Sequence, residues 1–346
     1  MMSARRCFDA AVAARVLRSE EICTNESVWL DAISEAVLAK PGPIHYVSAG
    51  TNKGFNVVHF LRRYANTTVL PSDWLREQSQ FLHASTTVRK ARGVDKYLSC
   101  GRCGGCKDDH TPPVGSREVN VHAFELVPEN VAWLRWAFAR FALRANVVHA
   151  AAGNFSGRMP VPSLGAVGFG FERATVSVAD HEMVDGVESA GRPNRFSHFG
   201  RAVKLGEYFE EEELGFVHVV QIDCEGFDGL VVHGMAEPLR RGRVGVFQFE
   251  ASNGANWRRA PAGNQTLGNL LRWLPAHYAC FVEVRSACLV PIAPAHCGWI
   301  DGIEESQAHN VICALDGAYQ EALWRVVGRC VEWPLEKVIG NSQDAR

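Results

Sequence analysis

The sequence lacks any long run of apolar residues. None of its stretches approaches the roughly 18 apolar residues that a membrane-spanning helix needs, within a length of 346 residues. The opening segment, MMSARRCFDAAVAARVLRSEE, carries arginines but not the apolar centre of a secretory signal. We therefore expect a cytoplasmic protein without a membrane span. The arginine-rich start leaves targeting to an organelle open.

The sequence also lacks a strong excess of charge. The formal net charge is −2, so there is no electrostatic basis for a nucleic-acid partner. Hydrophobic residues make up 47% of the chain and charged residues 21%, as in ordinary globular proteins. The length fits one large α/β domain or two smaller ones, and nothing in the sequence specifies an oligomeric state.

Cysteine is plentiful, with eleven residues. Without a secretory signal this number predicts a reducing compartment, where thiols pack in the core, bind metal or react. Five cysteines fall in or near predicted strands and are expected in the core: Cys224, Cys280, Cys288, Cys297 and Cys313. Four N-x-S/T sequons, at Asn25, Asn66, Asn154 and Asn264, are by the same reasoning interpreted as chance matches.

Strands and helices alternate along the chain, which predicts an α/β fold with a mostly parallel sheet and helices on both faces. The predicted strands cover residues 44–50, 119–125, 146–153, 216–223, 243–250, 278–284 and 309–315. Helical spacing of apolar residues marks 26–40, 56–64, 128–143 and 266–274. We divide the chain into an N-terminal helical extension (1–43), a main domain (44–315) and a C-terminal helix and tail (316–346). Polar segments at 65–118 and 159–201 are interpreted as insertions at the edges of the sheet.

The stretch VSAGTNKGFN, residues 47–56, connects the first strand to a helix. Gly50 and Gly54 are separated by three residues, which matches neither the G-x-G-x-x-G loop of dinucleotide-binding folds nor a P-loop. The spacing suits a nucleoside ligand without phosphates, of which S-adenosylmethionine is the commonest. A tight turn that binds no ligand is the alternative.

Acidic side chains follow three of the predicted strands. Glu125 ends the second strand, where an acid can accept hydrogen bonds from both ribose hydroxyls. Asp223 and Glu225 follow the fourth strand, and Glu250 ends the fifth. Because the carboxyl ends of parallel strands meet at one edge, these acids are expected around one crevice. Acids grouped in this way are costly unless they are hydrogen-bonded or used.

Four motifs together resemble the FkbM-like S-adenosylmethionine-dependent methyltransferases. SAGTNKGFN resembles the family's D-x-G-x-N-x-G loop, and AFELVPEN resembles A-F-E-P-x-P-x-N. AAAGNFSG is similar to A-x-G-D-x-x-G, and QIDCEGFDGLVVHG to K-I-D-x-E-G-x-E/D-x-x-V-L-x-G. The resemblance covers about residues 44–315. It implies a class I methyltransferase (Rossmann-like) sheet of seven strands, with the last strand antiparallel.

The same resemblance implies O-methylation of a hydroxyl group on a small molecule or glycan. The residues implied to bind the cofactor are Ser48, Gly50, Asn52, Gly54, Glu125, Asn154 and Asp223. One of three acids, Asp223, Glu225 or Glu250, would orient or deprotonate the acceptor.

Three positions depart from the family pattern, each by replacing a charge with a neutral polar group. Ser48 stands where the family has Asp, Gln221 where it has Lys, and Asn154 where it has Asp. The alternative function is therefore a non-catalytic cofactor-binding or scaffold relative. A nicotinamide oxidoreductase is disfavoured by the glycine spacing.

A cysteine cluster lies in the first insertion. Cys100, Cys103, Cys106 and His110 form C-x₂-C-x₂-C-x₃-H, which supplies four ligands of the kinds that tetrahedral zinc takes. Structural zinc is one interpretation. The other is an uncoordinated or redox-sensitive loop, because the usual two well-separated ligand pairs are missing.

Overall fold

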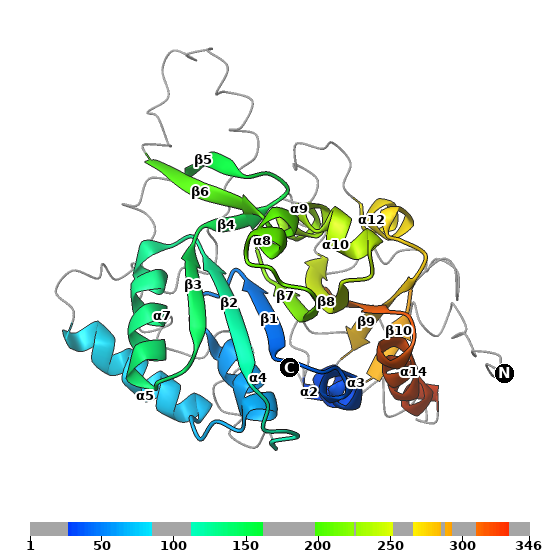
Figure 1. Cartoon of the computed structure of the whole chain (residues 1–346), viewed down its shortest axis with the longest axis horizontal. Helices are drawn as coiled ribbons and strands as arrows, with labels where there is room; N and C mark the ends of the chain where they lie inside the picture. Colours follow the sequence, from blue (N-terminus) through cyan, green and yellow to red (C-terminus); the bar gives the residue numbers. More distant parts are fainter. Residues whose placement is uncertain are drawn as a thin grey trace, which may run out of the picture.

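The computed structural model describes residues 27–84, 112–161, 198–224, 226–251, 266–284, 288–292 and 309–331. Its main feature is an eight-stranded sheet with the order β10-β9-β11-β8-β7-β1-β2-β3. Strands β3, β2, β1, β7 and β8 pair in parallel, whereas β11 is antiparallel to both of its neighbours, β8 and β9. Figure 1 shows this sheet with helices packed around it.

The strands occupy the predicted segments with small shifts in their ends. They are β1 (Ile44–Ala49), β2 (Val119–Glu125), β3 (Ala145–His149), β7 (Val217–Ile222), β8 (Val244–Ala251), β9 (Tyr278–Val284), β10 (Cys288–Pro291) and β11 (His309–Leu315). The prediction of seven strands is wrong by one, because β10 pairs antiparallel with β9 at the sheet edge. An antiparallel last strand, β11, is confirmed.

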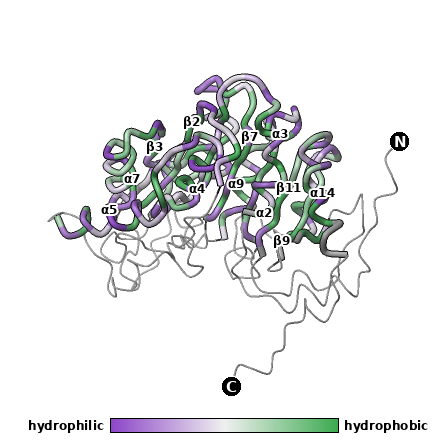
Figure 2. The backbone as a smooth tube through the Cα atoms, turned by 90° about the horizontal axis from the view of Figure 1, so that it is seen from below, coloured by the Kyte–Doolittle hydropathy of each residue, from purple (hydrophilic) through white to green (hydrophobic). Residues whose placement is uncertain are grey.

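Helices cover both faces of the sheet, and each set has its own hydrophobic core. One face packs against α2 (Ser27–Ala32), α3 (Ser34–Ala39), α4 (Phe55–Ala65), α5 (Pro71–Ala84), α7 (Pro128–Arg140) and α14 (Ala318–Val331). The other packs against α8 (Leu205–Glu211), α9 (Asp228–Gly234), α10 (Ala236–Arg240) and α12 (Leu267–Trp273). Figure 2 shows hydrophobic colouring along β7 and β11. Such continuous burial is what strands covered on both faces require.

A second, three-stranded sheet has the order β4-β6-β5. The segment predicted as one strand at 146–153 divides at Ala150 into β3 and β4 (Ala151–Gly153). The ends of the second polar segment form β5 (Gly157–Val161) and β6 (His198–Lys204), which pair antiparallel. Met159 and Ala202 pack against Leu126 and Phe227, so this sheet borders the loops at the carboxyl ends of β2 and β7.

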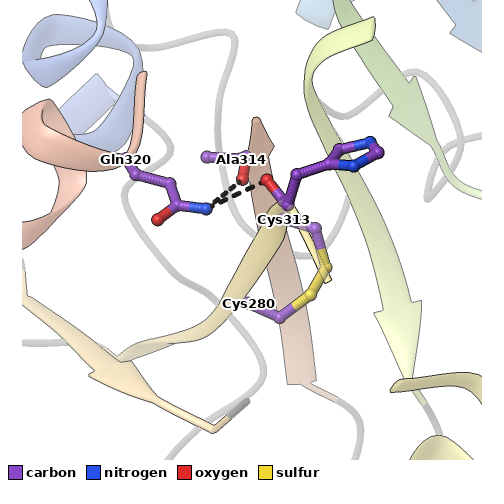
Figure 3. Close-up of a disulfide and its surroundings, with 5 residues drawn as sticks. Cys280, Cys313, Ala314 and Gln320 are labelled. Carbon is purple, nitrogen blue, oxygen red and sulfur yellow. Dashed lines mark hydrogen bonds between the residues drawn. A yellow bond between two sulfur atoms is a disulfide. The ribbon is translucent and has the colours of Figure 1, made fainter. Parts of the chain in front are cut away.

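A disulfide joins the two antiparallel strands β9 and β11. Cys280 and Cys313 are register partners, both buried, and their sulfur atoms are bonded (Figure 3). Their predicted place in the core is confirmed, but the expectation of reduced thiols is wrong for this pair. The side-chain amide of Gln320 in α14 donates to the carbonyl oxygens of Ala314 and His277, both at 3.2 Å, which fixes the helix beside the same strands.

Across the described ranges, no helix has the length and apolar character that crossing a bilayer requires.

Candidate functional site

The glycine loop lies where the strand order reverses. The chain passes from β1 to β2 and β3 on one side, then returns to β7 and β8 on the other. In open α/β sheets this switch point, at the carboxyl edge, is where ligands bind. Gly50 has φ +77°, and a Cβ on it would lie 1.9 Å from the carbonyl oxygen of Asp223. Only glycine fits there, because both the conformation and the backbone contact exclude a side chain.

Two tryptophans hold the far end of the loop. The indole N–H groups of Trp74 in α5 and Trp133 in α7 donate to the carbonyl oxygen of Lys53, at 2.7 and 3.0 Å. Both rings are fully buried. Gly54 follows with φ +82°, and a Cβ there would meet Leu134 and Trp74. Sequence reasoning did not identify the two tryptophans, because at helical spacing they are indistinguishable from other core residues.

Glu125, at the end of β2, is bonded to the loop through its side chain. One carboxylate oxygen accepts from the backbone N–H of Asn52 and the other from that of Val127, both at 2.7 Å. Burial raises the pKa of Glu125, and these hydrogen bonds oppose the rise. The side-chain amide of Asn130 and the backbone N–H of Leu126 also favour the charged form of this carboxylate. Glu125 therefore has a structural role alongside any binding role.

Asn52 has a left-handed backbone, with φ +50°. Its side-chain oxygen accepts from the amide of Asn130 at 3.4 Å, so the predicted loop residue is linked to α7. The structure thus brings together Gly50, Asn52, Gly54 and Glu125, four of the predicted cofactor residues.

The three neutral departures from the family pattern are not equivalent. Ser48 is fully buried, and its hydroxyl accepts from the side-chain amide of Asn56 at 3.0 Å. Gln221 is the register partner of Ser48 and is also buried. Asn154, by contrast, is exposed in the turn after β4. The first two positions face the protein interior, and only the third reaches solvent.

Gln221 belongs to a polar chain that crosses three strands. The hydroxyl of Tyr46 in β1 donates to the side-chain oxygen of Gln221, and the Gln221 amide donates to the side-chain oxygen of Gln248 in β8 at 2.8 Å. All three side chains are buried. Sequence reasoning missed this chain. The sequence feature that could have indicated it is the stretch FQFE, where Gln248 stands on a face of the strand that is otherwise apolar.

The predicted acids lie at the carboxyl ends of β7 and β8. Asp223 is exposed directly after β7, and Glu250 is half-buried near the end of β8. Glu225 lies outside the described residues. A further acid, Asp228, is completely buried at the start of α9 and accepts from the backbone N–H groups of Gly226 and Glu250, both at 3.1 Å. Through these two hydrogen bonds Asp228 connects the loop after β7 to the end of β8.

Burial raises the pKa values of the titratable groups at this edge of the sheet. Burial raises the pKa of Asp228 to about 7, and repulsion from Glu250 adds to the rise. Burial also raises the pKa of Glu250. Cys224, a half-buried free thiol, has its pKa raised first by burial and then by Asp228, Asp223 and Glu125. The thiol therefore lies among carboxylates contributed by β2, β7 and α9.

The predicted zinc ligands Cys100, Cys103, Cys106 and His110 lie outside the described residues. Among the residues that the structure does describe, no group of three or more His, Cys, Asp or Glu side chains is arranged to hold a metal ion.

The chain is similar to the crystal structure of Methyltransferase FkbM from Methylobacillus flagellatus KT, with 10% sequence identity and a TM-score of 0.36. The similarity covers 87% of this chain and 58% of that one, so it spans less than two thirds of the neighbour. No protein-family model matches the sequence. No curated protein matches it either. The neighbour carries the family name that the sequence motifs resemble.

Proposed function

We propose that the chain is an S-adenosylmethionine-dependent methyltransferase of the class I fold that methylates a hydroxyl oxygen on a small molecule or glycan. The observation that carries the proposal is the arrangement at the switch point, where Glu125 is hydrogen-bonded to the glycine loop and, with Asp223 and Asp228, lies near Cys224. The strand order supports it. Without β10 and β11, the order is β9-β8-β7-β1-β2-β3, which is the 3-2-1-4-5-6 order of nucleotide-binding doubly wound sheets.

The chemistry of the donor groups fits this cofactor. Glu125 would accept from the ribose hydroxyls, and the loop from Gly50 to Gly54 would lie against the nucleoside. The described acids around Cys224 favour a ligand with sulfonium and ammonium charges and disfavour a pyrophosphate. When bound, S-adenosylmethionine supplies a methyl group activated by its positive sulfur.

The protein's own contribution would be to position the acceptor and to remove its proton. Glu250 is suited to the second task, because it is half-buried at the carboxyl edge and its pKa is raised towards neutral pH. Asp228 holds the backbone of Glu250 and would keep that carboxylate in place. Asp223, which is exposed beside the loop, would orient the acceptor or the cofactor.

Binding is tested by thermal unfolding with S-adenosylmethionine, S-adenosylhomocysteine and, as a control, NADH. At a hundred times its Kd, a ligand stabilises the folded state by about 2.7 kcal/mol. We expect a rise in Tm with the first two compounds and none with NADH. Calorimetric titration of folded Glu125→Gln should show weakened binding. Glu118→Gln, at an exposed glutamate near the start of β2, should leave binding unchanged. A shift with NADH alone would contradict the proposal.

Turnover is tested separately, by transfer of a labelled methyl group to a panel of hydroxyl-bearing acceptors. Glu250→Gln should abolish transfer and leave cofactor binding intact, because the amide can accept a hydrogen bond but not a proton at neutral pH. A Glu250→Gln variant that binds the cofactor and still transfers the methyl group would show that Glu250 is not the base.

A non-catalytic cofactor-binding relative is the second candidate, and Ser48 is the observation in its favour. The serine hydroxyl is buried and bonded to Asn56, so β1 ends without the carboxylate that the family has there. Binding of S-adenosylmethionine without methyl transfer to any acceptor in the panel would favour this candidate.

A further inference from the structure

The disulfide between Cys280 and Cys313 bears on the compartment in which the chain folds. Both residues are buried in the core between the sheet and the helices α8, α9, α10 and α12. Disulfides form and persist in oxidising compartments and are rare in proteins of the cytosol. The bond requires that two thiols lose two protons and two electrons to the disulfide of a carrier protein, which is thereby reduced to a dithiol. Because both sulfur atoms are then enclosed by the fold, the oxidation belongs to folding in such a compartment.

Folding in an oxidising compartment also raises the question of whether the N-x-S/T sequons carry glycans. The opening segment shows no secretory signal, which is why the sequons are interpreted from the sequence as chance matches, whereas the disulfide indicates a chain that folds in an oxidising compartment. N-linked glycans are attached to Asn-x-Ser/Thr on surface loops of proteins that pass through the secretory route. Two of the four sequon asparagines, Asn66 and Asn154, lie in the described ranges, and both are exposed.

Asn66 has the geometry of an accessible acceptor. It caps the C-terminus of α4 with a left-handed backbone, φ +52°, and is exposed together with Thr68, the hydroxyl residue of its sequon. The backbone N–H of Arg117 donates to the carbonyl oxygen of Tyr64 at 2.8 Å, which places this end of α4 beside the start of β2. The loop therefore lies at the edge of the sheet opposite Glu125 (Figure 1). A glycan there would leave the candidate site open.

Asn154 has a different setting. The hydroxyl of Ser156, which completes its sequon, donates to Glu207 at 2.5 Å and accepts from the backbone N–H of Lys204 at 3.1 Å. The turn also borders α9, since a Cβ on Gly234 would lie 2.0 Å from the carbonyl oxygen of Gly153. A glycan on Asn154 would crowd the carboxyl edge of the sheet.

We propose that Asn66 is an N-glycosylation site of a chain that folds in an oxidising compartment. The donor is a lipid-pyrophosphate-linked oligosaccharide. The side-chain amide nitrogen of Asn66 forms a bond to C1 of the terminal sugar, the bond from C1 to the pyrophosphate oxygen breaks, and the amide loses one proton as the lipid pyrophosphate leaves. This proposal does not depend on the methyltransferase activity.

The test uses the full chain isolated from its own cells. Peptide N-glycosidase in heavy-oxygen water converts a glycosylated asparagine to a labelled aspartate, which is read by mass spectrometry of the tryptic peptide 64–76. We expect label at Asn66. Alkylation before reduction should recover Cys280 and Cys313 in one linked peptide. An Asn66 peptide found only unmodified, or label on Asn154 in its place, overturns the assignment. Recovery of both cysteines as alkylated thiols overturns the oxidising compartment.

Two substitutions at Thr68 separate glycosylation from any structural role of Asn66. Thr68→Ala destroys the sequon and should remove the label and the glycan mass, although Asn66 and its backbone conformation are untouched. Thr68→Ser keeps the sequon and should keep both. Equal glycan mass in the Ala and Ser variants, expressed in the same cells, would show that the carbohydrate is attached elsewhere.

Discussion

Three histidines at the amino-terminal half of the sheet make stability depend on pH. The backbone N–H of His45 donates to Nδ1 of His218 at 3.1 Å, and Nδ1 of His45 lies 3.5 Å from Nε2 of His122. Nδ1 of His122 is 2.8 Å from the hydroxyl of Tyr208 in α8. Burial lowers the pKa of both His122 and His218 to about 4. His45, and for His218 also Lys40 and Arg117, add repulsion that opposes protonation.

The sign of the effect follows from the lowered pKa values. In the unfolded chain each histidine takes up a proton below about pH 6.5, whereas in the folded chain it does so only near pH 4. The stabilisation from each neutral histidine is therefore fully present above pH 6.5 and is lost as the pH falls to 4. Between pH 7.5 and pH 5 the loss is about 2 kcal/mol for each of the two residues.

Acidic groups with raised pKa values act in the opposite direction. Asp228, with a pKa of about 7, takes up its proton in the folded state first, so it stabilises the fold as the pH decreases from 7.5 to 5. The net pH dependence of the unmodified chain therefore mixes both contributions. A variant that removes one histidine isolates its share, because the acids remain the same in both proteins.

The measurement is urea unfolding of the chain and of His122→Gln at pH 7.5, 6 and 5. The amide can still hydrogen-bond Tyr208 but does not titrate. The difference in unfolding free energy between the two proteins should shift by about 2 kcal/mol in favour of the variant from pH 7.5 to pH 5. His83→Gln, at an exposed histidine, should show no such shift. Parallel pH profiles for the chain and His122→Gln would refute the reasoning.

Three other changes give equally direct tests. Gly50→Ala places a Cβ against a backbone carbonyl at positive φ and should cost about 2–4 kcal/mol in urea unfolding. Gly42→Ala, at φ +84° in open space, should cost only the backbone strain of about 1–2 kcal/mol, and equal losses would contradict the close approach. Replacing Cys280 and Cys313 by Ala opens a link across 33 residues and should lower the unfolding free energy by about 3–4 kcal/mol, whereas an unchanged midpoint would show that the bond is absent from the unmodified protein. If Cys100, Cys103, Cys106 and His110 hold a zinc ion, protein purified without chelator should contain near-stoichiometric zinc that Cys103→Ser sharply reduces; metal-free protein would leave the cysteine cluster as a redox-exposed loop.

The sequence alone determined where the central strands of the main sheet lie and which residues reach its carboxyl edge. Apolar runs bounded by glycine and acids mark β1, β2, β7 and β8, and parallel strands bring their carboxyl ends to one edge. The positions of Gly50, Glu125, Asp223 and Glu250 at one edge of the sheet follow from this local pattern and one rule of topology.

Only the tertiary structure decided which groups are paired there. Asp228 reads as an ordinary first residue of a helix, yet it is buried and bonded to the backbone of Glu250, because α9 packs against β8. In the sequence, Trp74 and Trp133 are indistinguishable from other core residues. In the structure, both donate a hydrogen bond to the carbonyl oxygen of Lys53. Such contacts join segments far apart in the chain, and no local periodicity encodes them.

The cysteines give the sharpest contrast between what the sequence predicts and what the tertiary structure decides. The sequence predicted that Cys280 and Cys313 are buried, because each stands in an apolar strand. It did not predict their bond, because that requires β11 to lie antiparallel beside β9 with these two residues in register. Burial is a property of each strand's own composition. Pairing depends on the strand order of the whole sheet, which the chain acquires only when it folds.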